Sequence, residues 1–131
     1  MTRVEENQRC PFCTVDEERV VLHNTWGFVI RDAYPVSPGH TLVIPRRHTG
    51  SFFALMPEER EALMTLLTHA RLALESAFRP DGYNIGINDG LAAGQTVFHL
   101  HLHLIPRYQG DRPDPRGGVR WVIPEKAKYW T

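Results

Sequence analysis

The sequence lacks features that would point to a nucleic-acid-binding, secreted or membrane protein. Lys and Arg number 15 and Asp and Glu also number 15, so the formal net charge is zero and nothing attracts the chain to nucleic acid or a membrane surface in general. The first residues, MTRVEENQRC, contain no apolar run, and no uninterrupted apolar stretch of about 18 residues occurs. We expect a cytoplasmic protein with no membrane or nucleic-acid partner, in which a local site binds any anionic ligand.

Cysteine is scarce, because the only two thiols are Cys10 and Cys13 in the order C-P-F-C. A chain of 131 residues is long enough to form a core without disulfides, and a cytosol keeps a plain disulfide reduced. The spacing suits a metal pair or a redox dithiol, with idle thiols as the alternative. A thioredoxin-like motif is disfavoured, because it should follow a strand and open a helix, whereas this pair precedes the first apolar run.

The remaining pattern predicts a single α+β domain over residues 1–131. Apolar runs rich in β-branched and aromatic residues, or alternating apolar and polar residues, predict strands at 19–24, 26–33, 40–45, 83–89 and 97–105. Leucines at helical spacing predict one long helix over about 57–78. The strands lack the intervening helices of parallel crossovers, so we expect an antiparallel meander under this helix. Residues 109–131 are too apolar for a free tail and predict an ordered C-terminal arm.

Three histidines alternate with leucines in FHLHLHLIPRY, residues 98–108. In a strand, His99, His101 and His103 would share one face with neighbours about 6.5 to 7 Å apart, and the leucines would pack on the helix. A solvated sheet face would explain one histidine better than three at strict alternation. Two chemistries could use such a row: a zinc-bound water, or attack of a neutral imidazole on phosphorus.

A second segment, PGHTLVIPRRH, brings two more histidines, His40 and His48, to the same sheet. One histidine from each of two strands would complete a Cys2His2 set with Cys10 and Cys13, which is the closed tetrahedral arrangement of a structural zinc. A closed site activates no water. This weakens the reading of a metal-activated hydrolase and leaves the other histidines for chemistry.

The motif H-L-H-L-H-L-I resembles the histidine triad of the HIT family of nucleotide hydrolases and transferases. The resemblance extends through PGHTLVIPRRH, NIGINDG and GQTVFHLHLHLIPRY and, with CPFC, covers residues 10–108. It implies a five-stranded antiparallel sheet with one long helix. It also implies a homodimer that packs through its sheets and helices.

The resemblance implies the catalytic residues as well. His101 corresponds to the nucleophile that attacks the α-phosphate of a nucleotide and forms a nucleotidyl-histidine, from which water releases the monophosphate. His103 and His40 correspond to residues that contact the phosphates and support the nucleophile, with His103 near the departing or entering oxygen. A backbone carbonyl on one ring nitrogen of His101 would fix the tautomer that leaves the other nitrogen nucleophilic.

Metal and nucleotide ligands follow from the same comparison. Zinc-bearing members have a CxxC pair and two later histidines, which resemble Cys10, Cys13, His48 and His99. Asp32 falls where the family binds the ribose hydroxyls, and a carboxylate accepts two such hydrogen bonds. The positions that hold the phosphate chain correspond to Asn88, Gly94, Gln95 and Thr96, although these residue types are also common in ordinary turns.

The expected function is hydrolysis of a dinucleoside polyphosphate at the α-phosphate, with release of AMP. The segment GQTVFHLHLHLIPRYQGD is more similar to that branch of the family than to the phosphoramidase branch, which tends to have Leu-Gly-Gly at residues 105–107. A phosphoramidase and a nucleotide-binding sensor with little turnover are the alternatives. Arg46, Arg47 and Arg107 flank strand ends, which leaves open whether they bind phosphate or face solvent.

Overall fold

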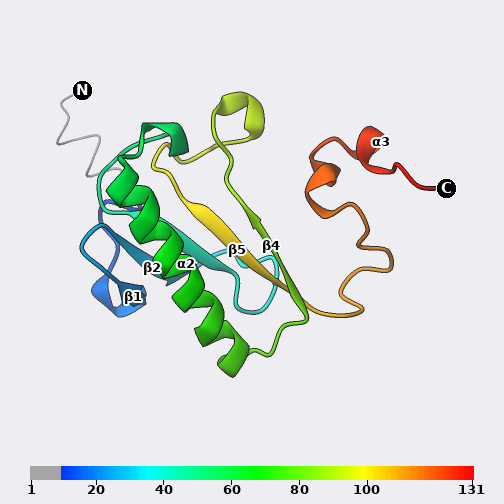
Figure 1. Cartoon of the computed structure of the whole chain (residues 1–131), viewed down its shortest axis with the longest axis horizontal. Coiled ribbons are helices and arrows are strands. Elements are labelled where there is room, and N and C mark those ends of the chain that lie inside the picture. The colour runs from blue at the N-terminus through cyan, green and yellow to red at the C-terminus, as the bar shows by residue number, and fades with distance from the viewer. Residues whose placement is uncertain (1–9) are drawn as a thin grey trace.

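The computed structural model describes residues 10–131, and five strands form one antiparallel sheet in it. Their spatial order is β1-β2-β3-β5-β4, with bounds β1 Val20–His23, β2 Gly27–Arg31, β3 Thr41–Pro45, β4 Gly82–Gly86 and β5 Leu102–Arg107. One long helix, α2 (Pro57–Ala77), lies across one face (Figure 1). The predicted α+β class, antiparallel sheet and long helix are confirmed. No helix in the described part is long and apolar enough to cross a membrane.

Two details of the predicted sheet are wrong. The strands do not form a meander, because β5 lies between β3 and β4. The predicted strand 97–105 begins only at Leu102, because its ladder with β3 stops at the pair Val43–Leu102, although β3 itself continues to Pro45. The Leu100 N–H turns instead to the carbonyl of Thr49, at 2.7 Å. His99 and His101 therefore lie on an irregular segment that leads into β5.

The core lies between the sheet and α2. Four helix residues at helical spacing face it: Leu63, Leu66, Ala70 and Leu74. They pack against Val29 and Val43 of the central strands, and against the three leucines that separate the histidines, Leu100, Leu102 and Leu104. Full burial of each leucine contributes about 1.5 to 3 kcal/mol. The predicted alternation of side chains is confirmed: the leucines point toward the helix, and the histidines lie on the opposite face of the sheet.

The chain after β3 is fixed to the start of α2 by one ion pair. Glu59 is fully buried and its Oε1 accepts hydrogen bonds from the Met56 N–H at 2.9 Å and from Arg47 Nη2 at 2.7 Å. These hydrogen bonds hold the pKa of Glu59 below its ordinary value despite burial. Arg47 is thus committed to the helix, next to His48, and does not point to a phosphate site.

The C-terminal arm contains a 3₁₀ turn, η4 (Gly118–Val122), and a short helix, α3 (Pro124–Ala127). In Figure 1 it lies beside β4, the edge strand, away from α2. Arg120 connects the two elements, since its guanidinium donates to the carbonyls of Ala127 and Lys126, at 2.8 Å each. The arm therefore has its own internal order. The predicted domain 1–131 includes residues 1–9, which lie outside the described residues.

Candidate active site and metal centre

The CPFC segment lies against the open face of the sheet. Phe12 packs against a second apolar cluster formed by Phe28, Ile30, Leu42 and Ile44. Its ring centroid lies 5.0 Å from that of His101 and 6.0 Å from that of His99. Phe12, one of the two residues between the cysteines, therefore connects them to the histidines just before β5.

The two cysteines meet His48 and His99, as the sequence predicted. His99 Nδ1 lies 3.3 Å from Cys10 Sγ and 3.2 Å from His48 Nδ1, and His48 Nδ1 lies 3.2 Å from Cys13 Sγ. The second ring nitrogen of His99, Nε2, lies 2.7 Å from the Pro45 carbonyl, which only accepts hydrogen bonds. The proton of His99 is therefore on Nε2, and the Nδ1 lone pair faces the sulfurs.

This donor set fits a zinc ion. A tetrahedral zinc with bonds of about 2.0 to 2.3 Å separates neighbouring N and S ligands by about 3.3 to 3.8 Å, and all four ligand atoms lie within 4.8 Å of one another. Burial lowers the pKa of His99, which favours the neutral form that binds metal. Four protein ligands leave no coordination position for water. The cluster suits a structural ion that fixes CPFC to the sheet.

We expect one zinc per chain in the purified protein, and we expect its removal by a chelator to lower the unfolding midpoint by about 10 °C or more. The ion would join the N-terminal segment to the ends of β3 and β5, which are far apart in sequence. Metal analysis and thermal unfolding before and after chelation measure both. His48→Ala should lose the zinc, whereas the matched variant of the exposed helix histidine, His69→Ala, should retain it.

His101 has a defined tautomer. Its Nδ1 lies 2.9 Å from the backbone carbonyl of His99, and because a carbonyl only accepts, the ring proton is on Nδ1. The Nε2 lone pair is then free to attack an electrophile. The sequence predicts a backbone carbonyl on one ring nitrogen of His101 but does not indicate which carbonyl. It belongs to His99, one of the four residues of the Cys2His2 cluster, so the cluster and the orientation of His101 are joined through this residue.

His40 and His103 form a directed hydrogen-bond chain. The Val36 N–H donates to His40 Nδ1 at 3.1 Å, so the proton of His40 is on Nε2. That nitrogen lies 2.9 Å from His103 Nδ1, which must accept, and the proton of His103 is therefore on Nε2. Burial lowers the pKa of His40 and, with the neighbouring histidines, lowers the pKa of His103 to about 4. Both rings are neutral at pH 7, and His103 can donate one hydrogen bond.

Asp32 lies at the end of β2, beside this chain. Its Oδ2 is 3.4 Å from His40 Nε2, and its Oδ1 accepts a hydrogen bond from the Tyr34 N–H at 2.8 Å. The carboxylate raises the pKa of His40, but desolvation of the buried ring is the larger effect. Asp32 is close to the catalytic histidines predicted from the sequence and keeps oxygen lone pairs available for a ligand hydroxyl.

The four residues predicted to bind phosphate all lie in the segment between β4 and β5. They differ in exposure to solvent. Asn88, Gly94 and Thr96 are exposed. Gln95 is buried: its Oε1 accepts from the Gly90 N–H and its Nε2 donates to the carbonyls of Gly50 and Val97. These bonds shape the loop and use both amide hydrogens. That Gln95 holds a phosphate stays a prediction.

Sequence reasoning missed two participants. The Val36 N–H sets the tautomer of His40, and no sequence pattern marks a backbone donor of this kind. Phe12 packs on His101, and its place between the two cysteines was a signal that could have been used. Arg107 is directed elsewhere, since its guanidinium pairs with Asp111 at 2.7 Å and donates to Asn84 Oδ1 at 2.6 Å.

Comparison with known proteins gives a consistent result. The HIT domain family matches residues 14–110. An uncharacterized HIT-like protein of Mycoplasma pneumoniae is 38% identical over 107 residues, which are 79% of this chain and 74% of the relative. An asymmetrical bis(5'-nucleosyl)-tetraphosphatase of Schizosaccharomyces pombe is 44% identical over 77 residues, which are 59% of this chain and 42% of that protein.

Solved structures share the fold. A HIT family protein from Bacillus anthracis superposes with a TM-score of 0.71 at 39% identity, covering 76% of this chain and 74% of that one. A zinc-bound histidine triad family protein from Mycobacterium smegmatis has a TM-score of 0.71 at 35% identity, with coverage of 82% and 86%. The second structure is zinc-bound, and the present chain has a cluster of two cysteines and two histidines.

Proposed function

Because the chain belongs to the HIT domain family, we propose that it hydrolyses dinucleoside polyphosphates, such as diadenosine tetraphosphate, at the α-phosphorus and releases AMP. The observation that carries the proposal is the tautomer of His101, whose Nδ1–H is bound to the His99 carbonyl while Nε2 is free. The name of the similar tetraphosphatase supports this substrate class. Cleavage of a phosphate anhydride suits this site, because a polyphosphate leaves as an anion and needs only a hydrogen bond from a neutral histidine.

In the first proposed step, the Nε2 lone pair of His101 forms a bond to the α-phosphorus and the bond to the bridging oxygen breaks. The leaving nucleoside polyphosphate departs with the electron pair as an anion, and the nucleotidylated imidazole carries the positive charge. The His99 carbonyl stabilises that charge through the Nδ1–H. His103 Nε2–H donates a hydrogen bond to the departing oxygen, and a polyphosphate anion needs no complete proton transfer to leave.

In the second step, water attacks the same phosphorus and the P–N bond breaks. His101 returns as the neutral imidazole, AMP is released, and the proton of the water passes to solvent. Asp32 is proposed to accept hydrogen bonds from the ribose hydroxyls, and Asn88, Gly94, Gln95 and Thr96 are proposed to hold or shape the site of the phosphate chain. Cys10, Cys13, His48 and His99 would hold a structural zinc that fixes the His99 carbonyl.

A substrate panel tests the proposal directly. The protein is incubated with diadenosine tetraphosphate and with an AMP amidate, and the release of AMP is followed. We expect AMP and ATP from the tetraphosphate, and slower cleavage of the amidate, because an amine needs a full proton to leave and His103 is a neutral donor. Faster cleavage of the amidate would favour a phosphoramidase, and binding without turnover of either would favour a nucleotide sensor.

A further inference from the structure

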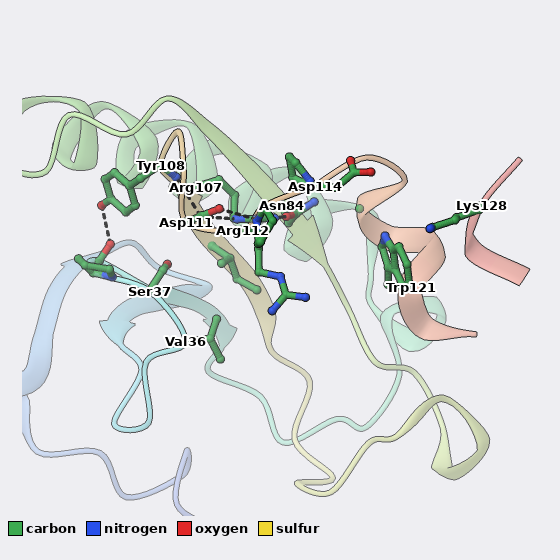
Figure 2. Close-up of a pocket in the computed structure, with 15 residues that line it drawn as sticks. Val36, Ser37, Asn84, Arg107, Tyr108, Asp111, Arg112, Asp114, Trp121 and Lys128 are labelled. Carbon is green, nitrogen blue, oxygen red and sulfur yellow. Dashed lines mark hydrogen bonds and ion pairs between the residues drawn. The ribbon is translucent and has the colours of Figure 1, made fainter. Parts of the chain in front are cut away.

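A cavity of about 720 Å³ lies between the sheet and the C-terminal arm. One wall is the loop before β3, with Val36, Ser37 and Pro38. The floor is formed by Asn84 of β4 and by Ile105 and Arg107 of β5, and the opposite wall comes from the arm (Figure 2). We call it the arm cavity. Neither the metal cluster nor the proposed site of the α-phosphate uses it.

The arm cavity continues the row of the catalytic histidines. His103, Ile105 and Arg107 alternate along β5 on the open face, so the floor begins about 7 Å beyond His103. Val36, which lines the cavity, donates its N–H to His40, the residue that orients His103. A group that leaves the α-phosphorus from His103 along β5 toward Ile105 would therefore enter the arm cavity.

The walls of the cavity are fixed by hydrogen bonds. Ser37 Oγ donates to the Pro106 carbonyl and Tyr108 OH donates to the Pro38 carbonyl, at 2.7 Å each. The Arg107 guanidinium is held by Asp111 and Asn84. The indole N–H of Trp121 donates to the Arg116 carbonyl at 2.7 Å, which orients its ring in the arm. The cavity is therefore preformed, so a ligand need not order these walls itself.

The lining combines cations with an aromatic surface. Three lining residues are cationic, Arg107, Arg112 and Lys128, and two are anionic, Asp111 and Asp114. The two acids pair with Arg107 and with Arg116. Arg112 and Lys128 form no ion pair within 4.0 Å in the described residues, although Lys128 is close enough to Asp114 to help lower the pKa of that carboxyl. In Figure 2 the Arg112 guanidinium points toward the Val36 side, and Trp121 and Lys128 lie across the cavity from it.

We propose that the arm cavity binds the leaving half of a dinucleoside polyphosphate. Arg112 and Lys128 contact the oxygens of the departing phosphate chain, and the half-exposed Trp121 ring stacks on the second base. The chain has no net charge, so attraction for an anion must be local, and these two cations, neither of which forms an ion pair, supply it. This inference rests on the proposed function and names the part of the substrate beyond the scissile bond.

The test compares substrates that share AMP and differ in the leaving group. For diadenosine tetraphosphate, the double variant Arg112→Gln/Lys128→Gln should raise KM about tenfold, and Trp121→Ala should raise it by a similar factor. For AMP fluoridate, whose leaving group is a single fluoride, both should leave KM unchanged. The control Lys126→Gln removes an arm cation outside the cavity lining and should change neither substrate.

A binding measurement separates this inference from the proposed function. In the His101→Asn background, the dissociation constant of diadenosine tetraphosphate should rise about tenfold with the double substitution, whereas that of AMP should not change. If the unmutated protein releases no AMP from either substrate, the proposed hydrolase activity is wrong. The dissociation constants still show whether the arm cavity binds the second half of the dinucleotide. Equal losses for both ligands, or no loss for the tetraphosphate, would overturn the arm cavity as the leaving-group site.

Discussion

His101→Asn should lower kcat for diadenosine tetraphosphate by about 10⁴-fold or more, while the fold and the zinc content stay unchanged. Among His99, His101 and His103, the variant removes the one ring that has an unprotonated nitrogen, Nε2, with no hydrogen-bond partner in the described residues. His101 is half-buried and outside the helix-facing core, so its loss should not unfold the protein. Steady-state kinetics, metal analysis and thermal unfolding measure the three quantities.

A trapped intermediate distinguishes this mechanism from metal-activated hydrolysis. With the natural sequence, rapid quenching in alkaline denaturant should reveal a chain that is heavier by one AMP group, because the P–N bond survives alkali better than acid. The adduct should map to His101 and be absent from His101→Asn. Turnover by that variant, or turnover of the natural protein with no adduct, would contradict nucleophilic catalysis by His101. The matched control is His23→Asn, the same substitution at an exposed histidine of β1, which should keep both turnover and adduct.

Much of the fold could be predicted because its signals are local. Helical spacing of Leu63, Leu66 and Leu74 predicted α2, and β-branched runs predicted the central strands, and each of these elements is present. The order of strands was less accessible, because β5 pairs with both β3 and β4 through contacts between distant segments. The homodimer stays a prediction.

The site shows where a periodic pattern is insufficient. The alternation of His and Leu correctly predicted which side chains face the helix, but it suggested a strand where Leu100 bonds to Thr49 instead. The roles divide because His99 lies past the end of β3, beside Pro45, whereas His103 lies within the ladder. Backbone donors and acceptors, the Val36 N–H and the His99 carbonyl, set the tautomers. Which backbone group reaches which ring nitrogen depends on the path of the chain, and the type of a single residue does not reveal it.

His103→Leu should lower kcat for diadenosine tetraphosphate by about 10²- to 10³-fold, the usual effect of removing one donor to a developing oxyanion. The hydrogen bond from Val36 to His40 and from His40 to His103 places the only proton of His103 on Nε2. With a pKa lowered to about 4, this ring is a neutral donor throughout the physiological range. Leucine fills a similar space and donates nothing, so the variant isolates the hydrogen bond. His103→Gln retains an N–H at a comparable position and should recover part of the rate.

The leaving group decides whether that donor acts on the departing oxygen. A series of AMP aryl esters with phenols of increasing pKa should show a steeper fall in rate for His103→Leu than for the natural sequence, because poorer leaving groups depend more on a donor. A merely structural role for His103 would lower the rate of every ester by the same factor and leave the slope unchanged. Parallel lines, whether from a structural role or from contact with the non-bridging phosphate oxygens, would contradict a donor to the departing oxygen. A steeper line for His103→Leu, with His103→Gln between the two, would establish that His103 donates its hydrogen bond to the departing oxygen.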